Sequence, residues 1–157
     1  MTWGSDAWKL ERDSYLREWI GNEDAFQFLM TVSDITELYD DLIDKDVDIE
    51  PDRVHQVMAM ALIGLPSNPF YLKHRIWLTP IMASSINSWR DATELEQGTR
   101  NERVVAYVIR NLDIQLIQAI IQITRGPEFL RTVSPQLWKM FAAEQDDFVA
   151  WVDGETT

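Results

Sequence analysis

The chain has 157 residues, about the size of one ordinary domain, and 46% of them are hydrophobic, which is enough apolar volume for one core. Its 26 Asp and Glu residues outnumber 14 Lys and Arg residues, and the formal net charge of −12 disfavours direct binding to nucleic acid or anionic membranes. The absence of cysteine excludes disulfides, thiolate metal sites and cysteine nucleophiles.

Glycine, proline and capping residues divide the chain into about six helical segments, and no stretch shows the two-residue alternation of a strand. We therefore predict an all-α fold, a single-domain helical bundle over residues 1–157, with frayed ends at 1–4 and 153–157. In chain order, the predicted helices cover residues 5–19, 22–45, 51–64, 70–97, 99–124 and 134–152.

Local signals set these boundaries. Asn22 is suited to cap the second helix, and Pro51 is suited to the first turn of the third. Pro80 lies within the fourth segment and is expected to kink or divide it. Thr99 is suited to cap the fifth segment, which should end at Gly126, while Ser134-Pro135 reads as the start of the last helix.

The sequence does not predict a secretory signal or a membrane span. Residues 1–6 lack a basic region followed by an apolar one, and no apolar run reaches ~18 residues. The closest candidate, residues 104–123, is interrupted by Arg110, Asn111, Asp113 and three glutamines. We expect this stretch to be a buried helix of a soluble, cytoplasmic protein.

The predicted second helix carries a stripe of carboxylates nearly opposite its apolar arc. At about 100° per residue, the stripe forms at spacings of three, four and three with one further residue beside it: Asp34, Glu37, Asp41 and Asp44, with Asp40 alongside. Hard oxygen ligands from successive turns suit Mg²⁺ or Mn²⁺. An acidic face in contact with water needs no ligand, so both interpretations remain open.

A second polar stripe lies in the fourth segment, where Ser84, Asn87, Asp91 and Glu94 repeat the same spacing. If this helix packs beside the second, carboxylates from both could converge on one metal, as they do in metal-binding bundles. The predicted metal ligands are therefore Glu37, Asp40, Asp41, Asp44, Asp91 and Glu94. Arg90 flanks the second stripe and is the first candidate for binding a phosphate group.

Two enzyme families share parts of this pattern. The run Asp40-Asp41-Leu42-Ile43-Asp44 resembles the DDxxD motif of class I isoprenoid synthases, all-helical enzymes whose aspartates hold Mg²⁺ against a diphosphate. Glu37-Leu38-Tyr39-Asp40 is similar to the ExxD pairs of all-α nucleoside triphosphate pyrophosphohydrolases of the MazG and dimeric dUTPase type, which also surround Mg²⁺. Both resemblances imply a metal-bound diphosphate or nucleotide.

The chain as a whole also resembles small uncharacterised helical proteins of tailed bacteriophages. The acidic run from Asp40 to Asp46, followed by Asn68-Pro69-Phe70-Tyr71, carries this resemblance. It implies a source, with the host cytoplasm as location, rather than a mechanism.

The fifth segment bears neutral amides between two apolar sides: Asn111, Gln115, Gln118 and Gln122. An uncharged polar stripe in so charged a protein suggests either a polar cavity or a homo-oligomer interface, although an exposed face would account for it equally. The histidines, His55 and His74, are interpreted as ordinary surface or boundary residues because neither sits in a nucleophile or metal pattern.

Two functional hypotheses follow. The first is a Mg²⁺- or Mn²⁺-dependent protein that binds or hydrolyses a diphosphate or nucleotide. The alternative is a non-enzymatic acidic interaction or virion-associated protein, encoded by a phage, that binds a basic partner.

Overall fold

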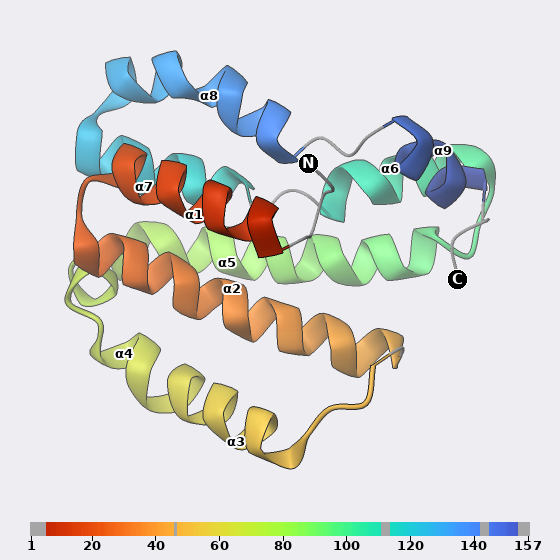
Figure 1. Cartoon of the computed structure of the whole chain (residues 1–157), viewed down its shortest axis with the longest axis horizontal. Coiled ribbons are helices and arrows are strands. Elements are labelled where there is room, and N and C mark those ends of the chain that lie inside the picture. The colour runs from red at the N-terminus through yellow and green to blue at the C-terminus, as the bar shows by residue number, and fades with distance from the viewer. Residues whose placement is uncertain (1–5, 46, 111–113, 142–144, 154–157) are drawn as a thin grey trace.

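The computed structural model describes residues 6–45, 47–110, 114–141 and 145–153, and every regular element in these ranges is a helix (Figure 1). The predicted all-α fold is therefore confirmed. The elements are α1 (Asp6–Ile20), α2 (Glu23–Asp44), α3 (Pro51–Ala59), the π-helical turn η1 (Met60–Gly64), α4 (Leu65–Ser67), α5 (Pro69–Leu95), α6 (Arg100–Arg110), α7 (Ile114–Arg125), α8 (Pro127–Phe141) and α9 (Gln145–Asp153). The expected frayed ends 1–4 and 154–157 lie outside the described residues, whereas residue 153 is the last of α9.

Asparagine caps begin the two longest helices. Gly21, with a φ of 60°, turns the chain after α1, and the Asn22 side chain then accepts a hydrogen bond from the Ala25 N–H at 2.9 Å, as the sequence predicted. Asn68 caps α5 in the same way, accepting from the Tyr71 N–H at 3.0 Å. These caps fix where the chain enters α2 and α5.

A reciprocal pair caps α6. The Thr99 N–H and hydroxyl donate to Glu102 Oε2 at 2.6 and 2.7 Å, and the Glu102 N–H donates back to the Thr99 hydroxyl oxygen at 3.4 Å. Because these donors favour the charged carboxylate, they hold the pKa of Glu102 below its ordinary value. The predicted start after Thr99 is confirmed, and Glu102 completes a capping box that the prediction had missed.

The break after the third predicted helix is confirmed, whereas the division expected at Pro80 does not occur. The third helix was expected to end near residues 64–66, and the helical run α3–η1–α4 ends at Ser67, before extended Asn68. Pro80 lies inside α5, which runs undivided from residue 69 to 95. Inside a helix, proline removes one backbone donor and its ring crowds the carbonyl four residues earlier, but fully buried Leu78 beside it keeps α5 packed on the core.

The predicted last helix was placed wrongly. Gly126, with a φ of 85°, ends α7 as expected, but the next helix begins at once, at Pro127. Pro135, expected in a first turn, lies inside α8, and α9 is a separate helix. Fully buried Leu137 follows Pro135, so core packing holds the helix across the proline.

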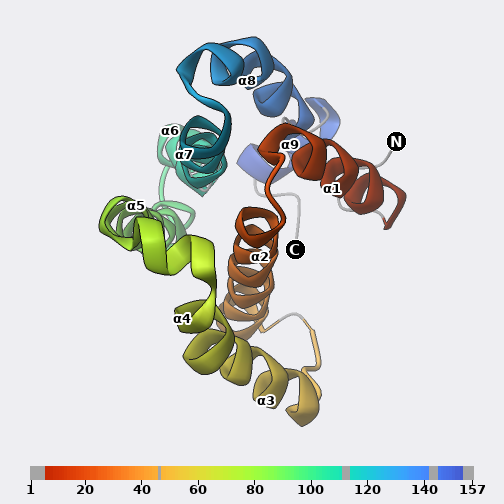
Figure 2. The ribbon, with the colours of Figure 1, turned by 90° about the vertical axis from the view of Figure 1, so that its left-hand side faces the viewer.

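The core lies between α1, α2, α5, α7 and α8, which are arranged around a common interior in Figure 2. α7 is central because it contacts the other four helices and buries most of its length. The side chains with almost no exposed surface include Leu16, Ile20, Phe28, Leu78, Ile120, Ile121 and Leu137.

The run α3–η1–α4, here called the arm, lies outside this core and packs mainly on α2 (Figure 2). Val57 is its one fully buried residue among those described. Met58, Leu62 and Ile63 of the arm expose large apolar side chains instead.

The predicted fifth segment, residues 99–124, contains α6 and α7, with residues 111–113 outside the described part. By length and composition alone, the stretch 100–125 could cross a membrane, and 40% of its most apolar window is buried. The buried face of α7 packs on the surrounding helices, which accounts for its hydropathy as that of a core helix.

Candidate functional site

Basic side chains from other elements reach the acidic stripe of α2. Lys9 Nζ of α1 lies 2.9 Å from Glu37 Oε1, and Arg53 of the arm lies 3.8 Å from the same carboxylate. Arg53 also lies 3.4 Å from Asp34. Asp34 and Glu37, the first two carboxylates of the stripe, are thus paired with lysine and arginine side chains of the protein itself.

Arg110, at the end of α6, reaches the next part of the stripe. Its guanidinium lies 3.4 Å from Asp40 of α2, and its Nε–H donates to Glu96, which follows α5. The guanidinium stands over the Trp89 ring, 5.2 Å from the centroid, while the Trp89 indole N–H donates to the Arg110 carbonyl at 3.2 Å. Trp89 in turn contacts Tyr39 of α2, at 5.8 Å between ring centroids.

This group, which we call the Arg110 cluster (Tyr39, Asp40, Trp89, Glu96 and Arg110), joins α2, α5 and α6. Arg110 and Glu96 expose only 19% and 21% of their side chains. Partial burial strengthens the attraction between two paired charges. It also makes the loss of one partner costly to the stability of the fold, because the other charge is then left desolvated. The cluster therefore stabilises the packing of α2 against α5 and α6. Asp40 contributes to it through its ion pair with Arg110.

The second predicted carboxylate pair does not meet the first. Asp91 and Glu94 are exposed on α5. Trp89 marks the side of α5 that faces α2, and Asp91 stands about 200° further around the helix. Arg90 is exposed as well and forms no ion pair within the described residues.

Within the described ranges, no group of three or more His, Asp or Glu side chains is arranged to hold a metal. Asp41 is half-buried and unpaired, and the Asp44 side chain lies outside the described part. The Mg²⁺ or Mn²⁺ site stays a prediction, and the geometry does not bring its six ligands together.

The amide stripe of α7 divides between two environments. Gln118 is half-buried and donates from Nε2 to Ser134 Oγ of α8 at 2.9 Å, beside a cavity of about 360 Å³. Gln115 and Gln122 are exposed, and Asn111 lies outside the described residues. Gln118 is therefore an interhelical contact between α7 and α8.

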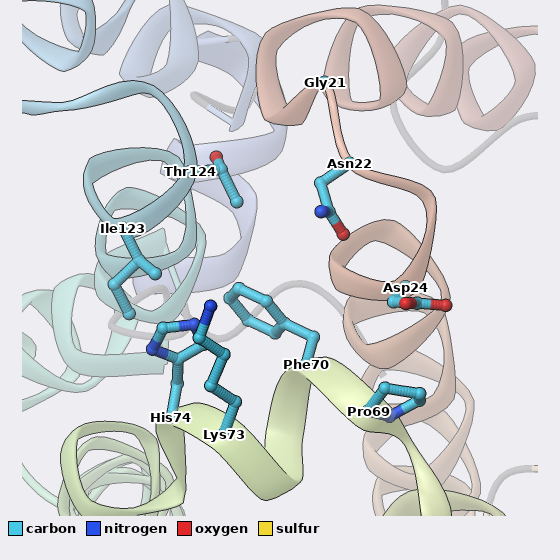
Figure 3. A pocket seen from close by; sticks show the side chains of 9 residues that line it. All are labelled: Gly21, Asn22, Asp24, Pro69, Phe70, Lys73, His74, Ile123 and Thr124. Carbon is cyan, nitrogen blue, oxygen red and sulfur yellow. The ribbon is translucent and has the colours of Figure 1, made fainter.

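A cavity of about 410 Å³ opens where α2 and α5 begin and α7 ends (Figure 3). Figure 3 shows Lys73, His74 and Phe70 of α5 directed toward Thr124 of α7. His74 lies against Phe70, with 4.8 Å between ring centroids. Thr124 is already used, since its hydroxyl donates to the carbonyl of Ile120 at 3.0 Å. The described lining offers one lysine, one imidazole, the carboxylate of Asp24 and an aromatic wall, without a paired nucleophile and base.

The remaining acidic feature is the segment 40–52, which we call the acidic end; it lies at the right of Figure 1, where α2 leads to α3. Its seven carboxylates and one lysine give a formal charge of −6, half of the −12 of the whole chain. Of its described members, Asp41, Asp48, Glu50 and Asp52 form no ion pair. Exposed apolar residues interrupt the charges: Leu42, Ile43 and Val47.

Comparisons with family models, with curated proteins and with solved structures found no match to this chain.

Proposed function

We propose that this is a non-enzymatic interaction protein whose acidic end binds a basic, amphipathic segment of a partner protein. The observation that carries the proposal is the mixture on that end: carboxylates without ion pairs, interleaved with exposed Leu42, Ile43 and Val47. Exposed apolar side chains that lie among unpaired carboxylates suit a partner that is both basic and apolar.

The chemistry of the partner follows from this mixture. Lysines and arginines of the partner would meet the carboxylates, while its apolar side chains would cover those of the acidic end. Such binding weakens with added salt because exposed charges are screened. If the chain is phage-encoded, as its resemblance implies, the partner is a basic surface of a host or virion protein.

The pairing of the α2 stripe supports this proposal over the metal hypothesis. Lys9, Arg53 and Arg110 already supply the positive charge that a cation would bring. The two hypotheses separate in a Mn²⁺ titration followed by thermal unfolding. A metal site raises the melting temperature by mass action, and Asp41→Ala abolishes the rise, whereas the interaction protein gives a flat titration up to millimolar Mn²⁺.

The direct test uses a synthetic amphipathic helix of leucine and lysine as the probe, with isothermal calorimetry as the measurement. We expect binding that weakens steeply as NaCl is raised, and about a tenfold loss of affinity in the variant Asp48→Asn/Glu50→Gln.

The matched control is Glu11→Gln/Glu18→Gln, which makes the same change of charge at exposed positions of α1. It should bind within about twofold of the unmodified chain, because those charges lie outside the acidic end. Equal losses in both variants would mean that overall charge alone attracts the probe, and the proposal would be wrong.

A further inference from the structure

The cavity between the starts of α2 and α5 and the end of α7 has the size and lining of a small-molecule site (Figure 3). Its volume of about 410 Å³ lies within the range of sites that bind small molecules. Its floor is apolar, because Phe70 belongs to the hydrophobic core and Ile123 packs against that core. An apolar or aromatic group of a ligand would leave water on this floor, which favours binding.

Two polar side chains at the rim of the cavity are hydrogen-bond donors. Figure 3 shows Lys73 and His74 directed to the same side, toward Thr124. Among the described residues, Lys73 forms no ion pair, and His74 contacts the Phe70 ring without a hydrogen bond to the protein. A lysine ammonium only donates, and a histidine ring carries at least one N–H. Both groups can therefore donate to a ligand.

Asn22 adds a donor at the same rim. Its side-chain oxygen accepts from the Ala25 N–H at 2.9 Å and so caps α2. Figure 3 shows the amide nitrogen on the side that faces Thr124, and it makes no hydrogen bond in the part of the chain that the structure describes. The Thr124 hydroxyl hydrogen is already used on the Ile120 carbonyl. The protein thus supplies donors at this rim, and a ligand has to supply acceptors.

Positive charge surrounds the cavity although the whole chain carries a formal net charge of −12. Arg125 packs against Gly21 in the wall and forms no ion pair in the described ranges. Glu23 is paired with Arg17 at 2.7 Å. The carboxylate of Asp24 belongs to the lining, but in Figure 3 it points away from the other polar groups of the rim. The rim therefore attracts a negatively charged group.

We propose that this cavity binds a small aromatic carboxylate. Its carboxylate would accept hydrogen bonds from Lys73, His74 and Asn22, while its ring would rest on the floor of Phe70 and Ile123. With one ammonium group at the rim, a singly charged carboxylate suits the site better than a doubly charged phosphate. The cavity lies about 25 Å along α2 from the acidic end, so this proposal does not depend on the binding of a basic partner there.

The test is a ¹H–¹⁵N NMR titration of the full chain with sodium benzoate as the probe. We expect saturable shifts of the amide signals of Asn22, Lys73, His74 and Thr124, with a dissociation constant of about 1 mM or below. Benzyl alcohol keeps the ring without the charge, and inorganic phosphate keeps the charge without the ring. Each should bind about tenfold more weakly than benzoate.

A matched pair of variants tests the role of the lysine. Lys73→Met removes the charge and keeps a long side chain, so it should weaken benzoate binding about tenfold. The melting temperature should stay unchanged, because Lys73 is exposed. Arg75→Met makes the same change of charge at an exposed position of α5 outside the cavity lining. It should bind benzoate within about twofold of the unmodified chain.

Three results would each overturn the proposal. The first is the absence of saturable shifts up to about 20 mM benzoate. The second is equal weakening of benzoate binding in Lys73→Met and Arg75→Met, which would mean that overall charge alone attracts the probe. The third is benzyl alcohol or phosphate that binds as tightly as benzoate, because the site would then not recognise the ring and the carboxylate together.

Discussion

Replacing Arg110 by methionine tests the account of the α2 stripe most directly. The change keeps a long unbranched side chain but removes the charge that joins Asp40, Glu96 and the Trp89 ring. A hydrogen bond to a charged group contributes about 1.5–3 kcal/mol, and we take about half of it because a fifth of each partner is exposed. The cation–π contact adds about 0.5–1 kcal/mol.

With a smaller contribution from the more exposed Asp40, the variant should lose about 2–3 kcal/mol of unfolding free energy, measured by urea denaturation. In a chain of this size that corresponds to a melting temperature lower by about 4–12 °C. In a double-mutant cycle with Glu96→Gln, the two changes should be coupled by about 1 kcal/mol or more.

The matched control is Arg131→Met, which breaks an ion pair with Glu128 whose side chains are 79% and 83% exposed. Such a pair contributes about 0.5 kcal/mol or less. If Arg110→Met destabilised the chain no more than this control, the Arg110 cluster would not hold the helices together. The structural role assigned to Asp40 would then fail.

Three further predictions concern single positions. Pro80→Ala should raise the unfolding free energy by about 1–3 kcal/mol, measured by urea denaturation, because it restores a backbone donor inside α5; an unchanged value would contradict this. Glu102, whose folded pKa is lowered, stabilises the fold above its ordinary pKa of 4.5, and this stabilisation is lost as pH falls through the folded value. The melting temperature of the unmodified chain should therefore drop more steeply in acid than that of Glu102→Gln; parallel pH profiles would refute the assignment. Gln118→Leu should change stability by less than about 1.5 kcal/mol, since Ser134 borders an open cavity where water can replace the lost bond; a larger loss in urea denaturation would show that Ser134 needs this partner.

The parts of the fold that depend on neighbouring residues could be predicted from the sequence. Asn22, Thr99 and Gly126 act within one helical turn, and each sets a boundary where it was expected. The behaviour of Pro80 and Pro135 depends on burial of the helix around them, which local signals do not contain.

The candidate site, like the fold, was predictable from the sequence only where neighbouring residues determine it. The carboxylates of α2 share a stripe because of helix geometry alone, but their partners come from distant parts of the chain. Lys9 is 28 residues from Glu37, and Arg110 is 70 residues from Asp40. No spacing in the sequence reports such contacts.

The arm gives the molecule two levels of resistance to opening. It contacts mainly α2, buries one side chain fully among those described, and is tied to α2 by the partly exposed pairs of Arg53. Its amide hydrogens should therefore exchange with solvent far sooner than those of α7, which the core encloses on several sides. We therefore expect the arm to open as a separate cooperative unit while the five-helix core stays intact.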